Sequence, residues 1–301
     1  MNRHGPLAFF RIFLGVVQMT MSLVTLGLYF QSGTTVWSVG ALIATLLLVL
    51  GSRLIFESDQ TVLLLKTMKK YFSEFLGTFC LVFAGTGAIV INQTSGGVIS
   101  HVGIAITFGL VVMAMIYTFG DISGAHLNPA VTCGFVAARR MQIGEGAFYI
   151  VSQLGGAIAA SAVMRFLFPQ NATLGMTQPA GSEMQSFVLE LLLTAILMLV
   201  ILSVSVGAKE KGITAGIAIG GVIALEAMFA GPVSGASMNP ARSLGPALMA
   251  NNFGSFWLYL AAPIAGALLA VPLCICVREK GCCSTKAIVV REAVFAVPGK
   301  R

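Results

Sequence analysis

The tripeptide Asn-Pro-Ala occurs twice in this chain, as Asn128-Pro129-Ala130 and as Asn239-Pro240-Ala241. Proline at the second position suits the first turn of a helix, because its missing N–H is not needed there. The asparagine before it can cap that turn with its side chain. Each copy leads into an apolar stretch that is too short to cross a membrane. The two copies therefore predict two half-length helices, which start near Asn128 and Asn239.

The two Asn-Pro-Ala tripeptides are called boxes below. Both boxes interrupt long apolar runs, and both follow small-residue segments, Ser123–Leu127 and Ser234–Met238. Irregular backbone at membrane depth is tolerated only where it lines a cavity or is buried in protein. Matching breaks in the two halves of a chain favour inverted repeats whose broken helices meet at the middle of the bilayer. Two ordinary turns are the alternative, since Asn-Pro commonly opens a turn. The matched flanks favour the half-helices.

The composition is that of an integral membrane protein. Of the 301 residues 57% are hydrophobic and 10% are charged, and the mean hydropathy is +0.91. Such values exclude an ordinary soluble domain. The 34 glycines fit helices that approach one another closely in lipid. The six cysteines follow no metal-ligand spacing, so we expect neither a metal nor another cofactor.

The net charge of +7 reflects membrane topology rather than nucleic-acid binding. With a cytoplasmic N-terminus, nearly all lysines and arginines fall on the cytoplasmic side, as the positive-inside rule requires. We therefore expect a protein of the plasma (cytoplasmic) membrane, with both termini in the cytoplasm and no nucleic-acid partner.

Eight apolar runs are long enough to span a bilayer. The first two, 7–31 and 36–56, predict an N-terminal two-helix hairpin, which the basic linker 66–70 joins to the rest. A signal peptide is the alternative for the first run, but a second span follows at once. The six later spans are expected at about 71–91, 101–120, 144–166, 184–206, 212–230 and 254–277.

The two halves of the chain repeat almost in register. Glu74 and Glu190 lie 116 residues apart, and Asn128 and Asn239 lie 111 apart. Three spans per repeat is an odd number, so the second repeat must be inverted in the membrane. Carboxylates at this depth are costly and normally face the bundle interior, paired with polar groups. We interpret Glu74 and Glu190 as structural braces for the two re-entrant loops, in preference to a proton relay.

These boxes and their flanks resemble the aquaporin, or major intrinsic protein, family over about residues 68–280. The segments Ile122–His126 and Gly231–Gly235 are similar to those of plant nodulin-like intrinsic proteins and their bacterial relatives. The resemblance implies an all-α membrane fold with six transmembrane helices and two re-entrant half-helices in inverted repeats, here preceded by two additional transmembrane helices. It also implies one pore per subunit and a homotetramer.

On this basis the chain divides into three parts. These are a hairpin with its linker (1–67), a channel domain (68–280, with repeats at about 68–166 and 184–280) and a cytoplasmic tail (281–301). Within the channel domain, two helix N-termini would place partial positive charge at the midplane. Asn128 and Asn239 would each offer an amide donor to a passing oxygen. A water whose oxygen accepts hydrogen bonds from both amides interrupts the transfer of protons along the file of waters, as is established for aquaporin-type pores.

The resemblance also places a selectivity filter at four positions, Phe108, Ala227, Ala236 and Arg242. Strict water channels commonly carry histidine at the position of Ala227, so two alanines imply a wider and less polar constriction. Glycerol channels usually have Asp where Ser243 stands and a basic residue where Ala247 stands. The choice of solute is therefore left open.

Glu226, beside Ala227, departs from the family pattern. It either adds an acceptor near the filter or pairs with Arg242. Alternatively, it is turned about 100° away from the pore and satisfied by backbone groups.

These observations predict a passive channel for water and small uncharged solutes (glycerol, urea or metalloid acids) that excludes protons and ions. A strict water channel is one alternative. A secondary transporter of a small solute, which also uses inverted repeats and broken helices, is another. A structural role without transport is the third. An enzyme is not expected, because His4, His101 and His126 form no constellation with a nucleophile or a set of metal ligands.

Overall fold

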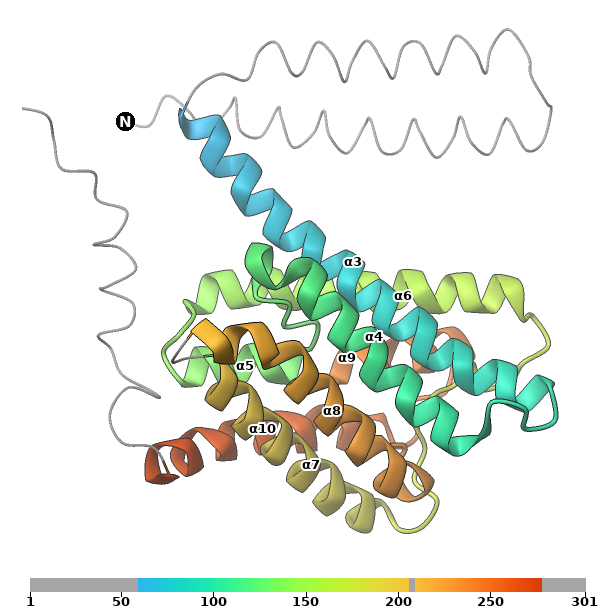
Figure 1. Cartoon of the computed structure of the whole chain (residues 1–301). Coiled ribbons are helices and arrows are strands. Elements are labelled where there is room, and N and C mark those ends of the chain that lie inside the picture. The colour runs from blue at the N-terminus through green and yellow to red at the C-terminus, as the bar shows by residue number, and fades with distance from the viewer. Residues whose placement is uncertain (1–58, 206–208, 278–301) are drawn as a thin grey trace, which may run out of the picture. The chain divides into compact units, whose positions relative to one another are not determined.

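The computed structural model describes residues 59–205 and 209–277, which form eight α-helices (Figure 1). The helices are α3 (Asp59–Thr94), α4 (Ser100–Ser123), α5 (Pro129–Ala137), α6 (Ile143–Leu167), α7 (Glu183–Val204), α8 (Lys209–Ser234), α9 (Pro240–Ala250) and α10 (Phe256–Val277). The predicted hairpin helices, 7–31 and 36–56, and the tail, 281–301, lie outside the described residues.

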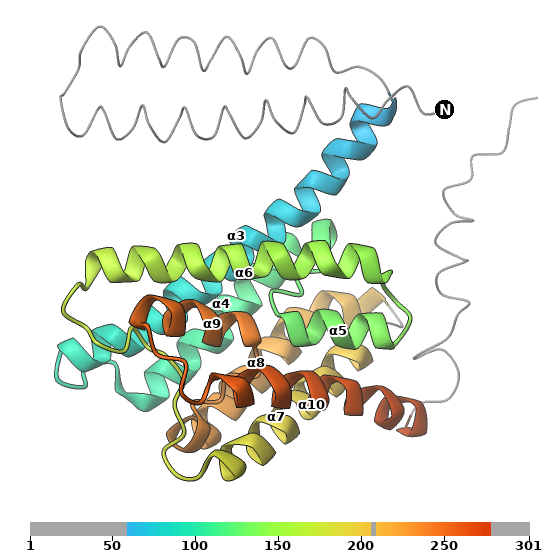
Figure 2. The same ribbon diagram turned by 180° about the vertical axis from the view of Figure 1, so that it is seen from behind.

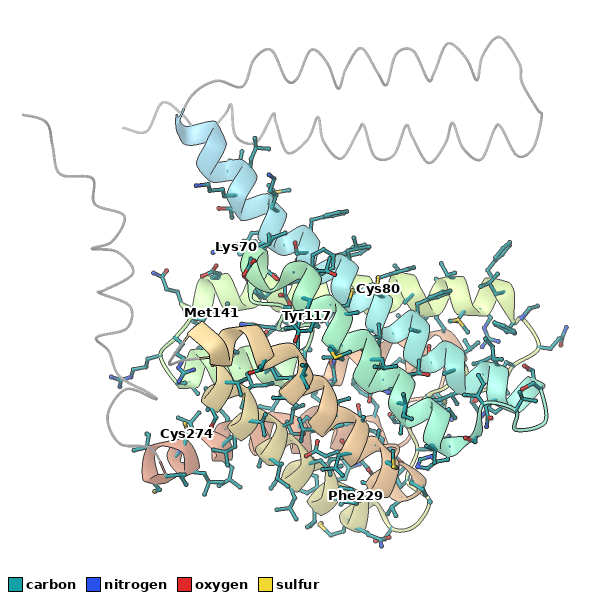
Figure 3. The ribbon with its side chains drawn as sticks, viewed as in Figure 1. Lys70, Cys80, Tyr117, Met141, Phe229 and Cys274 are labelled. Carbon is teal, nitrogen blue, oxygen red and sulfur yellow. The ribbon has the colours of Figure 1, made fainter. Side chains whose placement is uncertain are left out.

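Six of the described helices, α3, α4, α6, α7, α8 and α10, are long and apolar enough to cross a membrane. They correspond to the six later spans that the sequence predicts. Large apolar side chains cover their outer surfaces; Phe229 on α8, for example, is 58% exposed (Figure 3). A surface of this kind suits lipid rather than water.

The first of these helices starts earlier than the sequence predicts. Helix α3 begins at Asp59 and continues without a break through the basic stretch 66–70. The predicted linker is therefore helical, because lysine is a good helix former and its charge does not end a helix. Lys70 is held by an ion pair with Glu145 of α6, with a distance of 2.7 Å from Nζ to Oε1.

The two short helices, α5 and α9, contain 9 and 11 residues and begin at Pro129 and Pro240. Figure 2 shows them end to end between α6 and α10. Helix α9 packs mainly against α6, and α5 packs mainly against α10. Each half-helix thus contacts a spanning helix of the other repeat, which ties the two repeats together.

Equivalent glycines let the helices of each repeat approach closely. A Cβ at Gly156 of α6 would collide with the carbonyl oxygen of Phe75 on α3, and a Cβ at Gly266 of α10 would collide with that of Leu191 on α7. These two contacts occupy matching positions in the two repeats. Small residues at helix interfaces serve this purpose in membranes, where packing drives association.

Candidate pore and selectivity filter

Each half-helix is capped by the asparagine of its box. The side-chain oxygen of Asn128 accepts a hydrogen bond from the N–H of Ala130 at 2.9 Å, and that of Asn239 accepts from Ala241 at 3.0 Å. Asn239 also accepts from the N–H of Arg242 at 3.3 Å. Both asparagines have extended backbone, as an N-cap requires. The half-helices begin where the sequence predicts them.

The two boxes are also joined to each other. Nδ2 of Asn128 donates to the carbonyl oxygen of Met238 at 2.7 Å, and Nδ2 of Asn239 donates to the carbonyl oxygen of Leu127 at 2.9 Å. Each side chain therefore bonds its own helix through its oxygen and the opposite loop through its nitrogen. One hydrogen of each amide is used in this way, and the second has no partner among the described residues.

In the first repeat, the carboxylate of Glu74 on α3 binds the loop before Asn128. Its oxygens accept from the hydroxyl of Ser123 (2.7 Å) and from the backbone N–H groups of His126 (3.0 Å) and Leu127 (2.8 Å). Nε2 of Gln153 on α6 donates a fourth hydrogen bond at 2.8 Å. The carboxylate is fully buried.

The second repeat has the same arrangement around Glu190 of α7. Its oxygens accept from the hydroxyl of Ser234 (2.7 Å) and from the backbone N–H groups of Ser237 (2.8 Å) and Met238 (2.7 Å). Glu190 is likewise fully buried. Each carboxylate satisfies backbone donors of one re-entrant loop that would otherwise be orphaned inside the membrane.

Left-handed backbone occurs at matching places in the two loops. Gly124 and Gly235 have φ angles of 90° and 85°, and Leu127 and Met238 both have φ of 53°. Such a conformation costs a residue other than glycine about 1–3 kcal/mol, and it persists only where the surroundings fix it. The hydrogen bonds from these loops to Glu74 and Glu190 supply that support.

Arg242 lies in the first turn of α9 and is 2% exposed. Its Nη1 donates to the carbonyl oxygen of Gly175 at 2.9 Å, and its guanidinium carbon lies 5.2 Å from the ring centroid of Phe108. The Phe108 ring lies against Gly85 of α3, where a side chain would collide with it. The structure thus brings Phe108 of α4 together with Arg242, two of the four predicted filter residues.

The other two predicted filter residues, Ala227 on α8 and Ala236 in the loop before α9, are buried at 8% and 7% exposure. They belong to the same apolar cluster of buried residues. A methyl group is the largest side chain that either position supplies. Ala236 has a φ of 41°, so its place is fixed by the loop conformation described above.

Of the arrangements that the sequence suggests for Glu226, the pair with Arg242 and the hydrogen bonds from backbone groups are wrong, and an acceptor near the filter stays a prediction. It is 1% exposed, and both of its carboxyl oxygens have no hydrogen-bond partner among the described residues. It makes no ion pair with Arg242, whose side chain bonds Gly175 instead. Backbone donors do not satisfy it either, because it lies in the middle of α8, where the N–H groups serve the helix itself.

Sequence reasoning missed several groups that hold the site. The hydroxyls of Tyr149 and Tyr259 donate to the carbonyl oxygens of Ser123 and Ser234 at 2.7 and 2.6 Å. The two tyrosines lie 110 residues apart, almost the spacing of the two boxes, so extending the internal alignment would have found them. The carbonyl of Gly175 carries no comparable signal in the sequence.

The described residues hold no group of three or more His, Cys, Asp and Glu side chains that could bind a metal. The site is instead a set of backbone carbonyls, two amides, one guanidinium and one aromatic ring. Six spanning helices with two half-helices joined at their N-termini define the aquaporin class of channel. The aquaglyceroporin from Plasmodium falciparum has a similar structure, with a TM-score of 0.63 and 27% sequence identity over 69% of this chain and 95% of that chain.

Sequence comparison agrees with the fold. Residues 62–273 match the model of the Major intrinsic protein family. Aquaporin NIP1-4 from Oryza sativa subsp. japonica is 47% identical over 196 residues, which are 65% of this chain and 71% of that protein. Nodulin-26 from Glycine max is 44% identical over 202 residues, 67% of this chain and 74% of that protein. The chain belongs to the major intrinsic protein family and is of the NIP type. It is an integral membrane channel for water and small uncharged solutes, and it is not an enzyme.

Proposed function

We propose that this channel passes glycerol, urea or neutral metalloid acids together with water, while it excludes protons and ions. The observation that carries the proposal is the pair of buried alanines, Ala227 and Ala236, at two of the four predicted filter positions, whose other two members, Phe108 and Arg242, lie together. Neither methyl group closes the constriction in the way that a histidine ring does. The similarity to an aquaglyceroporin supports the same choice of solutes.

The filter would recognise such solutes by combining one apolar and one polar wall. The ring of Phe108 offers a face for the carbon edge of a polyol. Arg242 offers guanidinium hydrogens to the hydroxyl groups of the polyol, because among the described residues its side chain donates only through Nη1, to Gly175. The same positive charge repels cations. Water, which is smaller, passes without needing the apolar wall.

Proton exclusion is assigned to the two boxes. The N-termini of α5 and α9 carry partial positive charge, and they are joined through Asn128 and Asn239. The amide hydrogen that each asparagine does not use for the opposite loop is available to a water oxygen. A water that accepts from both cannot pass a proton along the file. Glu74 and Glu190 act as braces that keep this geometry.

The remaining parts of the proposal concern the setting of the pore. We assign the chain to the plasma (cytoplasmic) membrane with both termini cytoplasmic, because the basic residues then lie inside. Its subunits form a homotetramer, as the family resemblance implies, and the lipid bilayer surrounds them. The hairpin with its linker, 1–67, is not needed for conduction by the channel domain, 68–280, and the tail, 281–301, lies in the cytoplasm.

Stopped-flow light scattering on proteoliposomes tests this function. Vesicles with and without the protein are mixed with a higher external concentration of an impermeant osmolyte, glycerol or urea. We expect faster shrinkage, followed by faster re-swelling in glycerol and urea than protein-free vesicles show. Rapid shrinkage without faster re-swelling in either solute would indicate a strict water channel and would refute the wide filter.

A further inference from the structure

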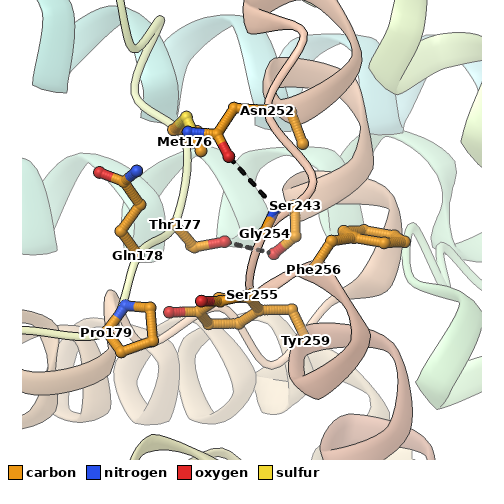
Figure 4. A pocket seen from close by; sticks show the side chains of 11 residues that line it. Met176, Thr177, Gln178, Pro179, Ser243, Asn252, Gly254, Ser255, Phe256 and Tyr259 are labelled. Carbon is orange, nitrogen blue, oxygen red and sulfur yellow. Dashed lines mark hydrogen bonds between the residues drawn. The ribbon is translucent and has the colours of Figure 1, made fainter. Parts of the chain in front are cut away.

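Beside the second half-helix lies a cavity of about 290 Å³ that the pore function does not use. The segment after Gly175 forms one wall, α9 forms the second, and the start of α10 with the segment before it forms the third (Figure 4). The residues that line it carry no formal charge. Its size is close to the lower end of the range for small-molecule sites in proteins.

Three hydroxyl groups run from this cavity to the second box. Thr177 donates to Ser243 at 2.9 Å, the oxygens of Ser243 and Ser237 are 2.5 Å apart, and Ser237 donates to the carbonyl oxygen of Asn239 at 3.0 Å. A carbonyl can only accept, so the hydrogen of Ser237 points to Asn239. The hydrogen of Ser243 must then point to Ser237. The chain of hydroxyls therefore has one direction, which starts at Thr177.

This direction leaves unused hydrogen-bonding capacity at the cavity end. The oxygen of Thr177 gives its own hydrogen away and accepts from no described donor, although the residue is buried. Gln178 makes no side-chain hydrogen bond among the described residues. Asn252 accepts from a backbone N–H of its own loop at 3.2 Å, and its amide hydrogens have no described partner. The cavity thus offers both an acceptor and donors.

The equivalent place in the first repeat is filled by side chains. Thr132, the counterpart of Ser243, lies 3.1 Å from Nδ1 of His126 and accepts from Nε2 of Gln153 at 3.0 Å. In the second repeat, the counterpart of His126 is the much smaller Ser237. The ring that lies beside Thr132 in one repeat is therefore replaced beside Ser243 by two small hydroxyl groups, those of Ser237 and Thr177.

We propose that this cavity is a binding site for a small neutral polyol. The absence of charge among its lining residues favours an uncharged ligand. The Thr177 oxygen and the amides of Gln178 and Asn252 match hydroxyl groups, which both donate and accept. Phe256 and Tyr259 offer apolar faces to the carbon chain. A polyol that donates to Thr177 also continues the chain of hydroxyls that ends on Asn239.

Saturation-transfer NMR with xylitol on the detergent-solubilised full-length chain tests this site, without any measurement of flux. We expect a transfer signal that saturates with xylitol concentration. Gln178→Leu, at an exposed position, removes the amide donors and should weaken binding about threefold to tenfold. Ala247→Met fills the cavity and should abolish the saturable signal. Thr173→Val, a change of the same loop outside the cavity, is the matched control and should bind as the natural chain does.

A signal that rises linearly with xylitol, or one that Gln178→Leu and Thr173→Val leave equal, would overturn the site. Because Gln178 is exposed, its substitution leaves the fold intact and decides the question even if Ala247→Met does not fold. The result is separate from the transport proposal. If the protein conducts glycerol but shows no saturable xylitol signal, only the polyol site in the cavity is refuted. If the protein binds xylitol at this site but conducts only water, only the proposal of a wide filter is refuted.

Discussion

Asn128 and Asn239 each donate a hydrogen bond to the residue that precedes the other asparagine, at 2.7 and 2.9 Å. Neither re-entrant loop is therefore complete without the other. The carbonyls of Leu127 and Met238 lie in left-handed backbone inside the membrane, where no lipid group can donate to them. The asparagines thus have two structural tasks, a cap and a cross-link, in addition to the proposed contact with water.

The cap and the cross-link can be separated by Asn128→Asp. A carboxylate keeps the capping acceptor but cannot donate to Met238, so a buried carbonyl loses its partner. We expect the free energy of unfolding to fall by about 1–3 kcal/mol, measured as a lower melting temperature in detergent. Asn92→Asp is the matched control, because within the described part of the chain the Asn92 side chain bonds only through its oxygen, which accepts from the N–H of Ser100 at 2.8 Å. Equal melting temperatures of the two variants would refute the cross-link.

The charge of Arg242 is the subject of the second prediction. Arg242→Val removes the guanidinium beside Phe108, and we expect water flow to continue while protons or small cations enter. Arg242→Lys keeps a positive charge and should keep the exclusion. Proton flux into proteoliposomes loaded with a pH-sensitive dye gives the comparison. If the proton flux through folded Arg242→Val is as low as that through Arg242→Lys, Arg242 is not the barrier to protons.

His101 provides a third prediction, through a hydrogen bond that the sequence does not reveal. Pro232 lies inside α8 and has no N–H, so the carbonyl of Met228, four residues earlier, loses its helical partner. Nε2 of His101 on α4 lies 2.7 Å from that oxygen and, because a carbonyl only accepts, must carry the hydrogen. Met228 directly follows Ala227, one of the predicted filter residues, so this bond fixes α8 next to that position.

A double-mutant cycle tests the pairing of His101 with the proline. We expect His101→Ala to lower stability by on the order of 1 kcal/mol. The same change should cost less in a Pro232→Ala background, because the new N–H can bond Met228 itself. Melting temperatures of the four proteins give the coupling. Equal losses in both backgrounds would show that His101 does not replace the missing donor.

The sequence predicted the six spans and the starts of both half-helices because their signals are local. Apolar length defines a span, and Asn-Pro defines a helix start. It did not predict that α3 begins at Asp59, since charged residues upstream of the apolar run are compatible with helix. The partner of Arg242 was also missed. That partner is the carbonyl of Gly175, and a carbonyl is present at every residue, so nothing in the sequence distinguishes it.

The surroundings of Glu226 are a further feature that the sequence could not predict. The sequence leaves open whether this residue adds an acceptor near the filter or is turned about 100° from the pore, and it does not show what surrounds it. The structure places it in the interior with no described partner for either oxygen. The sites of Glu74 and Glu190, by contrast, follow from the internal repeat, because each has a matching serine and matching loop N–H groups.

The fourth prediction concerns residues 1–67. We propose that this part is peripheral, and the family match begins only at residue 62. A shortened chain that begins at Thr67 should insert, assemble and conduct water at a rate per protein within about twofold of the full chain. Both proteins are compared in the same proteoliposome assay. A shortened chain that is well folded yet impermeable would place the N-terminal part in the pore or its gate.

The last prediction tests pore width at Ala227. A histidine there would add a polar ring at a predicted filter position that now carries only a methyl group. We expect Ala227→His to suppress glycerol flow by tenfold or more while water flow changes little, because water needs neither the width nor the apolar wall. Leu225→His is the control, since Leu225 on the same helix is 61% exposed and faces away from the core. The decisive quantity is the ratio of glycerol to water permeability, measured on the same vesicles for the natural chain and both variants. If Ala227→His leaves that ratio where Leu225→His does, position 227 does not limit the solute, and the constriction must lie elsewhere in the pore.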